Sequence, residues 1–355
     1  MEKMKPVALK DIARRAKVHL STVSLALRNS PNLPERTRAR LQRIARQMGY
    51  RPNPLVSALM AQRGRRKAVE VQAALAYLLL YPKDFLWQQN PLHRSIFQGV
   101  CERAAEFGFT VTTIDLTELG LTAERLESIL AARGIVGLLM PPFVRASDSL
   151  RQLNWSRFAA VSLGTIYPHA MIDHVSNDNY QSMRLIHQRC RELGYRRIGF
   201  VMNASLNPVQ EFRFSAADKL EQDNLPKAER VRPLFADMRP GIDIWPRETL
   251  AWCERERPDV IVTPVSQHAK PWLEFIRHLP GQPALVSLSV PRDNGPLAGI
   301  FQDGYEIGSV GAQILVNKIY RNEVGEQSKR WAHLLAGVWL DGPSCPPRIT
   351  GRRQA

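Results

Sequence analysis

The sequence is poor in the features that mark secreted, membrane-spanning or disulfide-linked proteins. It has four cysteines that lie far apart with no paired spacing: Cys101, Cys190, Cys253 and Cys345. That spacing argues against a disulfide framework or a zinc site and suits a reducing compartment. No run reaches about 18 uncharged apolar residues, so we expect no transmembrane helix and no membrane partner. The N-terminus lacks the apolar stretch of a secretory signal, so we expect a cytoplasmic protein.

The sequence also lacks the short motifs of common catalytic and nucleotide-binding sites. It contains no G-x-S-x-G, H-E-x-x-H, G-x-x-x-x-G-K-[ST] or G-x-G-x-x-G segment, which argues against hydrolase, zinc peptidase, P-loop and dinucleotide chemistry. The eight histidines are scattered, and the nearest pair in sequence, His169 and His174, is better explained by a surface loop than by a metal. We therefore expect no catalytic activity, no cofactor and no metal.

Acidic residues are scarce at one end of the chain. Residues 1–67 hold 17 Lys/Arg against 3 Asp/Glu, whereas the other 288 residues hold 32 against 30. Almost all of the formal net charge of +16 therefore lies in the first fifth of the chain. A cationic segment of this kind suits a polyanionic partner. The nearly neutral remainder is long enough for about two units of ordinary domain size.

The basic segment contains three stretches with helical spacing of apolar residues. The three apolar stripes are Leu9, Ile12, Ala13 and Ala16; Val23, Ala26 and Leu27; and Leu41, Ile44, Ala45 and Met48. Pro34 suits the first turn of the third helix, whose other faces carry Arg36, Arg38, Arg40, Arg43 and Arg46. Two short helices joined by a turn of about three residues, then a third helix, are typical of a helix-turn-helix DNA-binding domain.

A short helix and a linker are expected next. Pro52 and Pro54 prevent helix three from continuing. Asn53 could cap a short helix over residues 54–60, and residues 63–67 resemble a flexible basic linker.

From residue 71 apolar strand runs alternate with helical patterns. We expect strands at 73–80, 110–116, 135–140, 158–163, 198–202, 260–263 and 285–288, and helices at 95–107, 122–133, 180–193, 210–222, 249–256, 272–279 and 305–320. This alternation predicts parallel sheets with helices on both faces. Two such successions indicate two doubly wound subdomains, with a ligand cleft at the carboxyl ends of their strands.

Residues 7–59 resemble the DNA-binding domain of the lac repressor family of bacterial transcription regulators. The residues that carry this resemblance are Leu9-Lys10-Asp11-Ile12-Ala13, Ala16, Val18, Ser21-Thr22-Val23-Ser24, Ala26-Leu27, Glu35-Arg36-Thr37-Arg38, Gly49-Tyr50 and Arg51-Pro52-Asn53-Pro54. The body is similar to the family's effector domain in Asp178-Asn179-Tyr180, in residues 192–200 and in Gly308.

The resemblance implies that the helix from residue 20 to 29 enters the major groove of DNA. Leu20, Ser21 and Leu25 would then face base edges. Leucine can pack against a thymine methyl group but cannot read hydrogen-bond patterns, and serine is a permissive reader. Leu20 or Leu25 could instead pack inward. The other residues expected at DNA are Thr22, Ser24, Arg28, Asn29, Thr37, Tyr50, Asn53 and Val56. The arginines of helix three could bind phosphates or form a solvated face.

Three positions bear on how the DNA-binding segment is built. His19 stands where the family usually has a serine helix cap, and Lys17 where glycine or asparagine is common. Residues 54–60 resemble the family's hinge helix, in which a leucine, here Leu59, wedges into the minor groove and kinks the DNA. Alternatively, Leu55 and Leu59 form a contact between two hinge helices.

For an effector, the resemblance points to Arg213, which matches the family arginine in the cleft. Its planar guanidinium could bind sugar hydroxyls or a carboxylate; the alternative is a structural ion pair. Leu92, His93, Thr165 and Ile166 could line the same cleft. Ser289 stands where an acidic ligand-binding residue is frequent, which argues against an ordinary sugar or purine effector.

We therefore predict an all-α helix-turn-helix domain with a hinge helix, joined to an α/β body of two doubly wound parallel-sheet subdomains resembling periplasmic binding proteins. The expected division is residues 1–52 for the DNA-binding domain, 53–67 for the hinge and linker, 68–345 for the effector-binding and dimerisation domain, and 346–355 for a tail. Within the body, one subdomain takes about 68–175 plus 302–332, and the other about 176–301 plus 333–345.

The predicted function is that of a homodimeric repressor. It would bind a pseudo-palindromic operator in double-stranded DNA and respond to a sugar or another small metabolite bound between the subdomains. Two alternatives stay open: a solute-binding module of the periplasmic type without a regulatory role, and an enzyme tethered to DNA.

Overall fold

The computed structural model describes residues 9–27, 33–48, 73–79, 81, 86–117, 121–142, 148–236, 246–264, 269–292 and 295–348. The chain divides into two compact units. The N-terminal unit comprises Met1–Val71 with Ile319–Glu323, and the larger unit comprises Gln72–Lys318 with Val324–Ala355.

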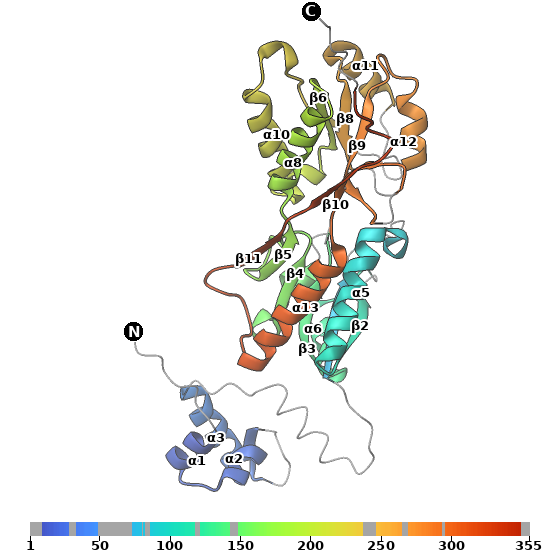
Figure 1. Cartoon of the computed structure of the whole chain (residues 1–355). Helices are drawn as coiled ribbons and strands as arrows, with labels where there is room; N and C mark the ends of the chain where they lie inside the picture. The colour runs from blue at the N-terminus through green and yellow to red at the C-terminus, as the bar shows by residue number, and fades with distance from the viewer. Residues whose placement is uncertain are drawn as a thin grey trace, which may run out of the picture. The chain divides into compact units, whose positions relative to one another are not determined.

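The N-terminal unit contains the three expected helices. They are α1 (Leu9–Ala16), α2 (Leu20–Leu27) and α3 (Glu35–Gln47) (Figure 1). Each contributes apolar side chains at helical spacing to one small core, in which Ile12, Val23 and Leu41 are fully buried. The alanines of the predicted stripes are buried beside them, which lets the helix backbones approach closely. The predicted helix-turn-helix architecture is thus confirmed.

The larger unit contains two six-stranded sheets. In the first, the strand order is β11-β5-β4-β3-β1-β2, and all described pairings are parallel. The strands are β1 (Ala73–Leu79), β2 (Phe109–Asp115), β3 (Ile135–Met140), β4 (Ala159–Leu163), β5 (Asp173–Asn177) and β11 (Ala332–Leu335). The helices that accompany them are α5 (Pro91–Glu106), α6 (Ala123–Ala132), α7 (Asp148–Arg151) and α13 (Gly304–Arg321). We call this sheet and its helices the first subdomain.

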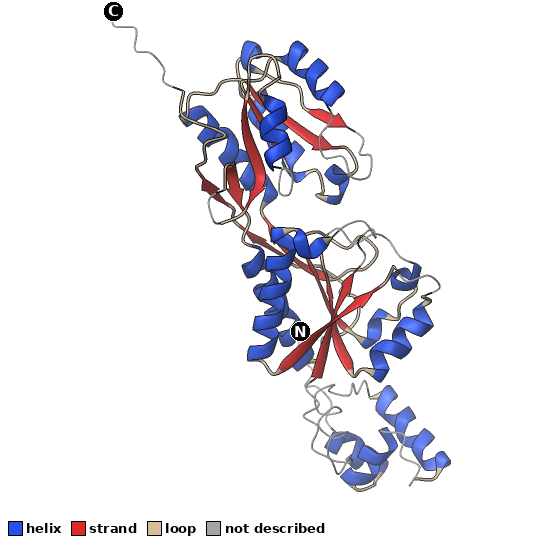
Figure 2. Cartoon of the chain, turned by 90° about the vertical axis from the view of Figure 1, so that its right-hand side faces the viewer, coloured by secondary structure: helices blue, strands red, loops and turns tan. Residues whose placement is uncertain are grey.

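The second sheet has the order β12-β10-β9-β8-β6-β7, with β12 antiparallel to β10. Its strands are β6 (Ile198–Asn203), β7 (Leu234–Ala236), β8 (Val260–Thr263), β9 (Ala284–Val290), β10 (Ala298–Phe301) and β12 (Val338–Leu340). Its helices are α8 (Asn179–Glu192), α9 (Leu206–Val209), α10 (Arg213–Asp223), α11 (Pro246–Glu256) and α12 (Ala269–Ile276). Three 3₁₀ turns, η1 (Trp87–Gln89), η2 (Trp155–Arg157) and η3 (Lys227–Glu229), complete the unit. This second subdomain and the first confirm the predicted fold class, with helices on both sides of the sheets (Figure 2).

Three chain segments connect the two subdomains. They run from β5 to α8, from β10 to α13 and from β11 to β12. The side-chain Nδ2 of Asn177 donates to Gln302 Oε1 at 3.0 Å, and Gln302 Nε2 donates to the carbonyl of Leu288, also at 3.0 Å. The Asp178 amide donates to the carbonyl of Leu335 at 2.7 Å. Hydrogen bonds therefore tie all three connections together at the junction of the sheets.

Helices α5 and α13 approach each other backbone to backbone. A Cβ atom placed on Gly308 would lie 2.0 Å from the carbonyl oxygen of Ile96, and one on Gly99 would lie 2.0 Å from that of Tyr305. These distances leave no space for any side chain. Gly308, one of the residues that carried the sequence resemblance, is therefore required by helix packing.

The predicted helix over residues 210–222 is wrong at its start. Glu211 and Phe212 adopt left-handed backbone conformations with φ of +51° and +57°, and α10 begins only at Arg213. Among the described residues, no helix combines the length and apolar character needed to cross a membrane.

Candidate nucleic-acid interface and ligand pocket

The turn between α1 and α2 is built without the expected residue types. Lys17 has φ of +52°, a left-handed conformation that glycine and asparagine adopt more readily. His19 precedes α2, and its Nδ1 atom accepts a hydrogen bond from the Ser21 amide at 3.3 Å. The Ser21 hydroxyl lies 2.8 Å from the same nitrogen. The histidine ring thus takes the place of a serine side chain as the cap of α2.

The residues predicted to face DNA bases lie at the start of α2. Leu20 is 44% exposed, so the alternative that it packs into the core is wrong. Ser21 is also exposed, and Thr22 and Leu25 are half-buried on the same helix. Thr37 is half-buried on α3. Ser24 is helical, but the structure does not describe its side chain. The other predicted DNA contacts, together with the hinge leucines, lie outside the described residues: Arg28, Asn29, Tyr50, Asn53, Leu55, Val56 and Leu59.

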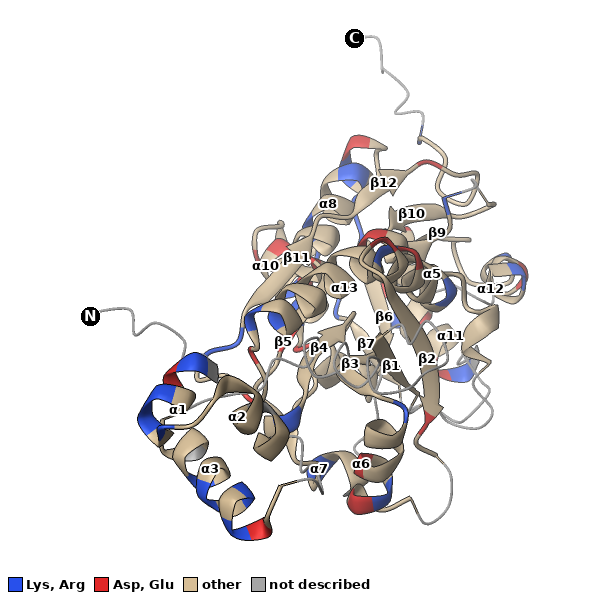
Figure 3. Ribbon diagram, turned by 90° about the horizontal axis from the view of Figure 1, so that it is seen from below, with Lys and Arg blue, Asp and Glu red and all other residues tan. Residues whose placement is uncertain are grey.

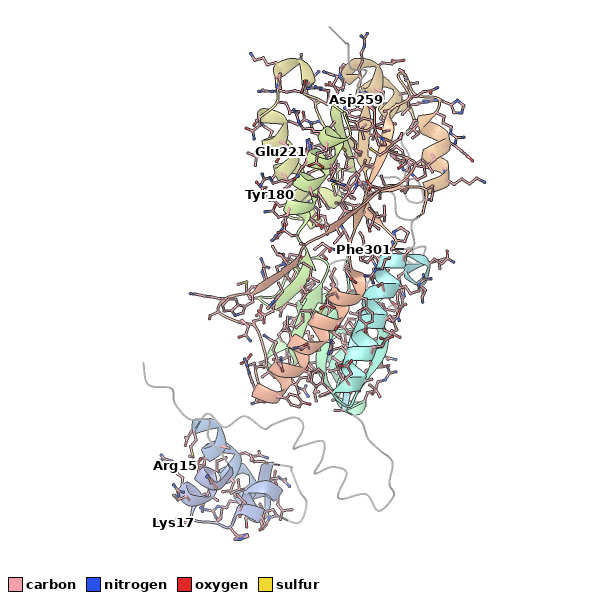
Figure 4. The ribbon with its side chains drawn as sticks, viewed as in Figure 1. Arg15, Lys17, Tyr180, Glu221, Asp259 and Phe301 are labelled. Carbon is pink, nitrogen blue, oxygen red and sulfur yellow. The ribbon has the colours of Figure 1, made fainter. Side chains whose placement is uncertain are left out.

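Lys and Arg residues recur along α1, along α3 and just after α1 (Figure 3). The exposed ones include Arg15 and Lys17, labelled in Figure 4, and the full set is Lys10, Arg14, Arg15, Lys17, Arg36, Arg40 and Arg43. The three helices contain two acidic residues, Asp11 and Glu35. Arg40 is not purely a surface charge, because its Nη2 donates to the carbonyl of Ala16 at 2.8 Å and caps α1. The other exposed cations form an electropositive surface suited to phosphates.

A small pocket lies between the two subdomains of the larger unit. Residues from β5 and the loop after β4 form one wall, and the start of α8 and the loop before α10 form the other. The lining residues are Gly164, Thr165, Ile166, His174, Ser176, Asn179, Val209, Gln210, Glu211 and Arg213. Its volume is about 10 Å³, roughly the space of one water molecule. The fold therefore brings together Thr165, Ile166 and Arg213 of the predicted effector residues.

Arg213 is engaged by a carboxylate within this pocket. Its Nε and Nη2 atoms donate to Glu211 Oε2 at 3.1 and 2.8 Å. The other carboxylate oxygen of Glu211 lies 3.7 Å from Nη2 of Arg330, which precedes β11 in the first subdomain. The sequence indicates Arg213 but neither Glu211 nor Arg330, because no local pattern shows that these three residues meet.

His174 lies on the pocket wall in a neutral state. Burial is the main cause that lowers its pKa to about 4, and the nearby Arg330 guanidinium lowers it further. Its Nδ1 atom is buried and has no hydrogen-bond partner within the described part of the chain. His174 therefore adds polarity but no charge to the pocket at neutral pH.

The other predicted effector residues do not line this pocket. Asn90 caps α5 by accepting hydrogen bonds from the amides of Leu92 and His93. The His93 ring is buried, with Nδ1 2.7 Å from the Tyr81 hydroxyl, in a cluster that includes Tyr77, Trp87 and Phe97. Ser289 is the penultimate residue of β9, and its backbone amide donates to Ser287 Oγ at 3.1 Å.

The burial of His93 predicts a loss of stability in mild acid. Burial lowers its pKa to about 3 in the folded protein, whereas an unfolded histidine titrates near its ordinary 6.5. The unfolded state therefore binds the proton first, and stability present at neutral pH is lost as the pH falls below about 6.5. The expected loss from this group is at most about 3 kcal/mol between pH 7 and pH 4. Urea unfolding of the wild type and of His93→Gln at both pH values measures it; identical pH dependence would contradict the assignment.

In the part of the chain that the structure describes, His, Cys, Asp and Glu side chains do not gather in threes that could hold a metal ion. Cys101, Cys190, Cys253 and Cys345 are all free thiols.

Comparisons with known proteins agree on one family. Residues 8–53 match the sequence profile described as "Bacterial regulatory proteins, lacI family". The HTH-type transcriptional repressor CytR of Escherichia coli (strain K12) is 26% identical over 209 residues, which cover 58% of this chain and 56% of CytR. The HTH-type transcriptional regulator CelR of Thermobifida fusca is 26% identical over 220 residues, which cover 60% of this chain and 62% of CelR. The alignments thus span little more than half of these relatives.

Solved structures show the same fold over a longer stretch. The transcriptional regulator CelR–cellobiose complex has a TM-score of 0.59 at 20% identity and covers 95% of this chain and 99% of that one. The lac repressor dimer bound to operator and the anti-inducer ONPF has a TM-score of 0.58 at 17% identity, with coverage of 96% and 100%.

Proposed function

The chain belongs to the lacI family of bacterial regulatory proteins, and from this premise we propose that it is a sequence-specific, DNA-binding repressor of transcription controlled by a small molecule. The observation that carries the proposal is the exposed, uncharged start of α2 on a strongly cationic three-helix unit. Cations supply affinity for any phosphate backbone, whereas Leu20 and Ser21 offer contacts that depend on the base.

The proposed complex is a homodimer on a pseudo-palindromic operator in the cytoplasm. Each N-terminal unit would insert α2 into the major groove of one half-site. The similar lac repressor structure is a dimer bound to operator, which supports this arrangement. The hinge helix, with Leu59 as its wedge, is part of the same proposal.

The pocket between the subdomains is the proposed effector site. Its walls belong to different sheets, so a bound ligand would favour one relative position of the subdomains over another. Coupling to DNA then follows from differential binding to two states of the dimer. CelR, which is similar in structure, binds cellobiose in the same fold and supports a small-molecule effector here.

A solute-binding module without a regulatory role is the weaker proposal, because it assigns no function to the cationic helices. We also propose that the chain has no catalytic activity, since the matching relatives are transcriptional regulators.

The test is selection of genomic DNA by the full-length protein. Fragmented DNA from the source organism is incubated with the protein, and the retained fragments are sequenced. We expect strong enrichment of a few sites with approximate two-fold symmetry. Retention in proportion to abundance would contradict sequence-specific binding.

Leu20 provides a sharper version of this test. Replacing Leu20 by serine is expected to weaken binding to an enriched site roughly tenfold, because it removes an apolar contact with the base edge. The matched control is Leu250→Ser, since Leu250 is a leucine of similar exposure, 39%, on α11 of the larger unit. Equal affinity of Leu20→Ser and Leu250→Ser for the enriched site would rule out a reading role for Leu20.

A further inference from the structure

Glu211 stands between two arginines that come from different subdomains. Arg213 belongs to the same subdomain as Glu211 and donates two hydrogen bonds to Glu211 Oε2, the shorter of which is 2.8 Å. Arg330, from the segment before β11, faces the other oxygen at 3.7 Å. All three side chains are partly exposed, with between 27% and 38% of their surface accessible. The carboxylate thus acts as a bridge that a soluble molecule can reach.

The backbone that carries Glu211 is strained. Glu211 and Phe212 are consecutive non-glycine residues with positive φ, a backbone conformation that side chains with a Cβ atom adopt only at an energetic cost. Burial of Phe212 does not offset this cost, because its side chain is 53% exposed. The turn is held by backbone hydrogen bonds from Glu211 to Pro208 and from Phe212 to Asn207, both at 2.9 Å. Backbone strain of this kind is typical of loops that hold a side chain in a fixed place at a ligand site, here the carboxylate of Glu211.

The charges at the pocket do not balance. Arg213 and Arg330 contribute two positive charges against the single carboxylate of Glu211. Among the described residues that line the pocket, Glu211 is the only acid, and the polar remainder consists of neutral groups such as Thr165, Ser176 and Gln210. His174 stays neutral, as described above. A second anion would therefore find an uncompensated positive charge and a planar guanidinium suited to bidentate binding.

We propose, on the basis of the proposed effector site, that the effector is an anion, a small molecule with a carboxylate or a phosphate. In the absence of the effector, the Glu211 carboxylate occupies the effector's place on Arg213 and Arg330. Displacement of Glu211 from Arg330 breaks a direct link between the two subdomains. The effector then bridges Arg213 and Arg330 in place of Glu211, so its size and shape determine how the two subdomains are held relative to each other.

The experiment compares three hexoses that share one ring and differ at the sixth carbon. D-glucuronate carries a carboxylate, D-glucose 6-phosphate a phosphate, and D-glucose no charge. Binding of each to the full-length protein is measured by calorimetry at constant ionic strength, for the wild type and for Glu211→Gln. The amide keeps the shape of the side chain but no longer neutralises the arginines.

A matched control lies on the next helix. Glu221, labelled in Figure 4 on α10, forms an ion pair with Arg184 at 2.9 Å and does not line the pocket. Glu221→Gln therefore removes the same charge from an ion pair of the same subdomain. We expect Glu211→Gln to bind at least one of the two anions ten times more tightly than the wild type does. The anion affinities of Glu221→Gln should match those of the wild type. The affinity for D-glucose should not change on Glu211→Gln. Which anion gains distinguishes a carboxylate effector from a phosphorylated one.

Three results would overturn the inference: D-glucose binding as tightly as both anions, no gain in anion affinity on Glu211→Gln, or no anion binding to that variant up to about 50 mM. The DNA selection experiment is scored separately. If enriched sites are found but the anions fail, only the inference about the effector falls. If no site is enriched, the proposed function itself fails, whatever the anions do.

Discussion

Replacing Gly308 by alanine is expected to lower the free energy of unfolding of the larger unit by about 3 kcal/mol. The added Cβ would lie 2.0 Å from the carbonyl oxygen of Ile96 and 2.9 Å from the backbone nitrogen of Val100. Both are backbone atoms of α5, so no side chain can rotate away, and the two helices must separate. Alanine's better helix propensity, worth about 1 kcal/mol, recovers only part of this cost.

Gly295 provides the control for this substitution. It has an ordinary backbone conformation, and a Cβ placed on it meets nothing within 4 Å. Gly295→Ala is therefore expected to change stability by no more than about 0.5 kcal/mol. Denaturant unfolding of both variants makes the comparison. A Gly308→Ala protein as stable as Gly295→Ala would show that α5 and α13 do not pack backbone to backbone.

Replacing Val23 by aspartate is expected to abolish specific DNA binding, with a loss of affinity for an enriched site of at least about 100-fold. Val23 is fully buried in the three-helix core beside Ile12, Ala13 and Ala45. An unpaired carboxylate there costs several kcal/mol, and a core this small provides little stability to lose. Helix α2 then no longer presents Leu20 and Ser21 in a fixed geometry.

The control for Val23→Asp is Val338→Asp. Val338 lies on β12 of the larger unit and is 56% exposed, so the same change adds a charge without burying it. Binding to an enriched fragment is measured for both variants, and the thermal transition of the larger unit is followed by circular dichroism. We expect Val23→Asp to lose the fragment while that transition is preserved. Undiminished DNA binding by Val23→Asp would refute the assignment of DNA reading to the N-terminal helices.

The sequence predicted seven of the described strands and missed β5, in which four of five residues are polar, and the short strands β7, β10, β11 and β12. The run at residues 135–140 became β3, because a buried parallel strand is covered on both faces and needs apolar side chains throughout. β5, with the sequence Asp-His-Val-Ser-Asn, is equally buried but has one apolar residue. Two of its polar side chains have partners far away in sequence: Asp173 pairs with Lys318 at 2.6 Å, and Asn177 Nδ2 donates to Gln302 Oε1. Such partners cannot be read from local pattern.

In the candidate sites, too, features set by neighbouring residues were predictable and contacts between distant residues were not. The start of α2 was predictable, because helix spacing and turn length are local properties. The cap provided by His19 was not, since it depends on the direction of one ring. Arg213 could be named by resemblance, but its partners could not. Glu211 lies in what reads as a continuous helix, and Arg330 is brought to it only by the return of the chain through β11.

The uneven distribution of Lys and Arg along the chain has a role in the proposed function. In the proposed function, the excess of Lys and Arg in residues 1–67 would supply affinity for DNA and its dependence on salt, whereas the exposed residues at the start of α2 are uncharged. Affinity and sequence choice are thus assigned to different side chains of one small unit.

The measurement that tests this account most directly is the dissociation constant for an enriched genomic fragment and for random DNA of equal length, across about 50 to 200 mM salt. The account predicts that both constants rise steeply with salt, by about a thousandfold or more for 6–10 phosphate contacts. The enriched fragment should stay at least about 1,000-fold tighter at every salt concentration. Equal constants for the two DNAs at all salt concentrations would contradict the central claim that this chain is a sequence-specific regulator.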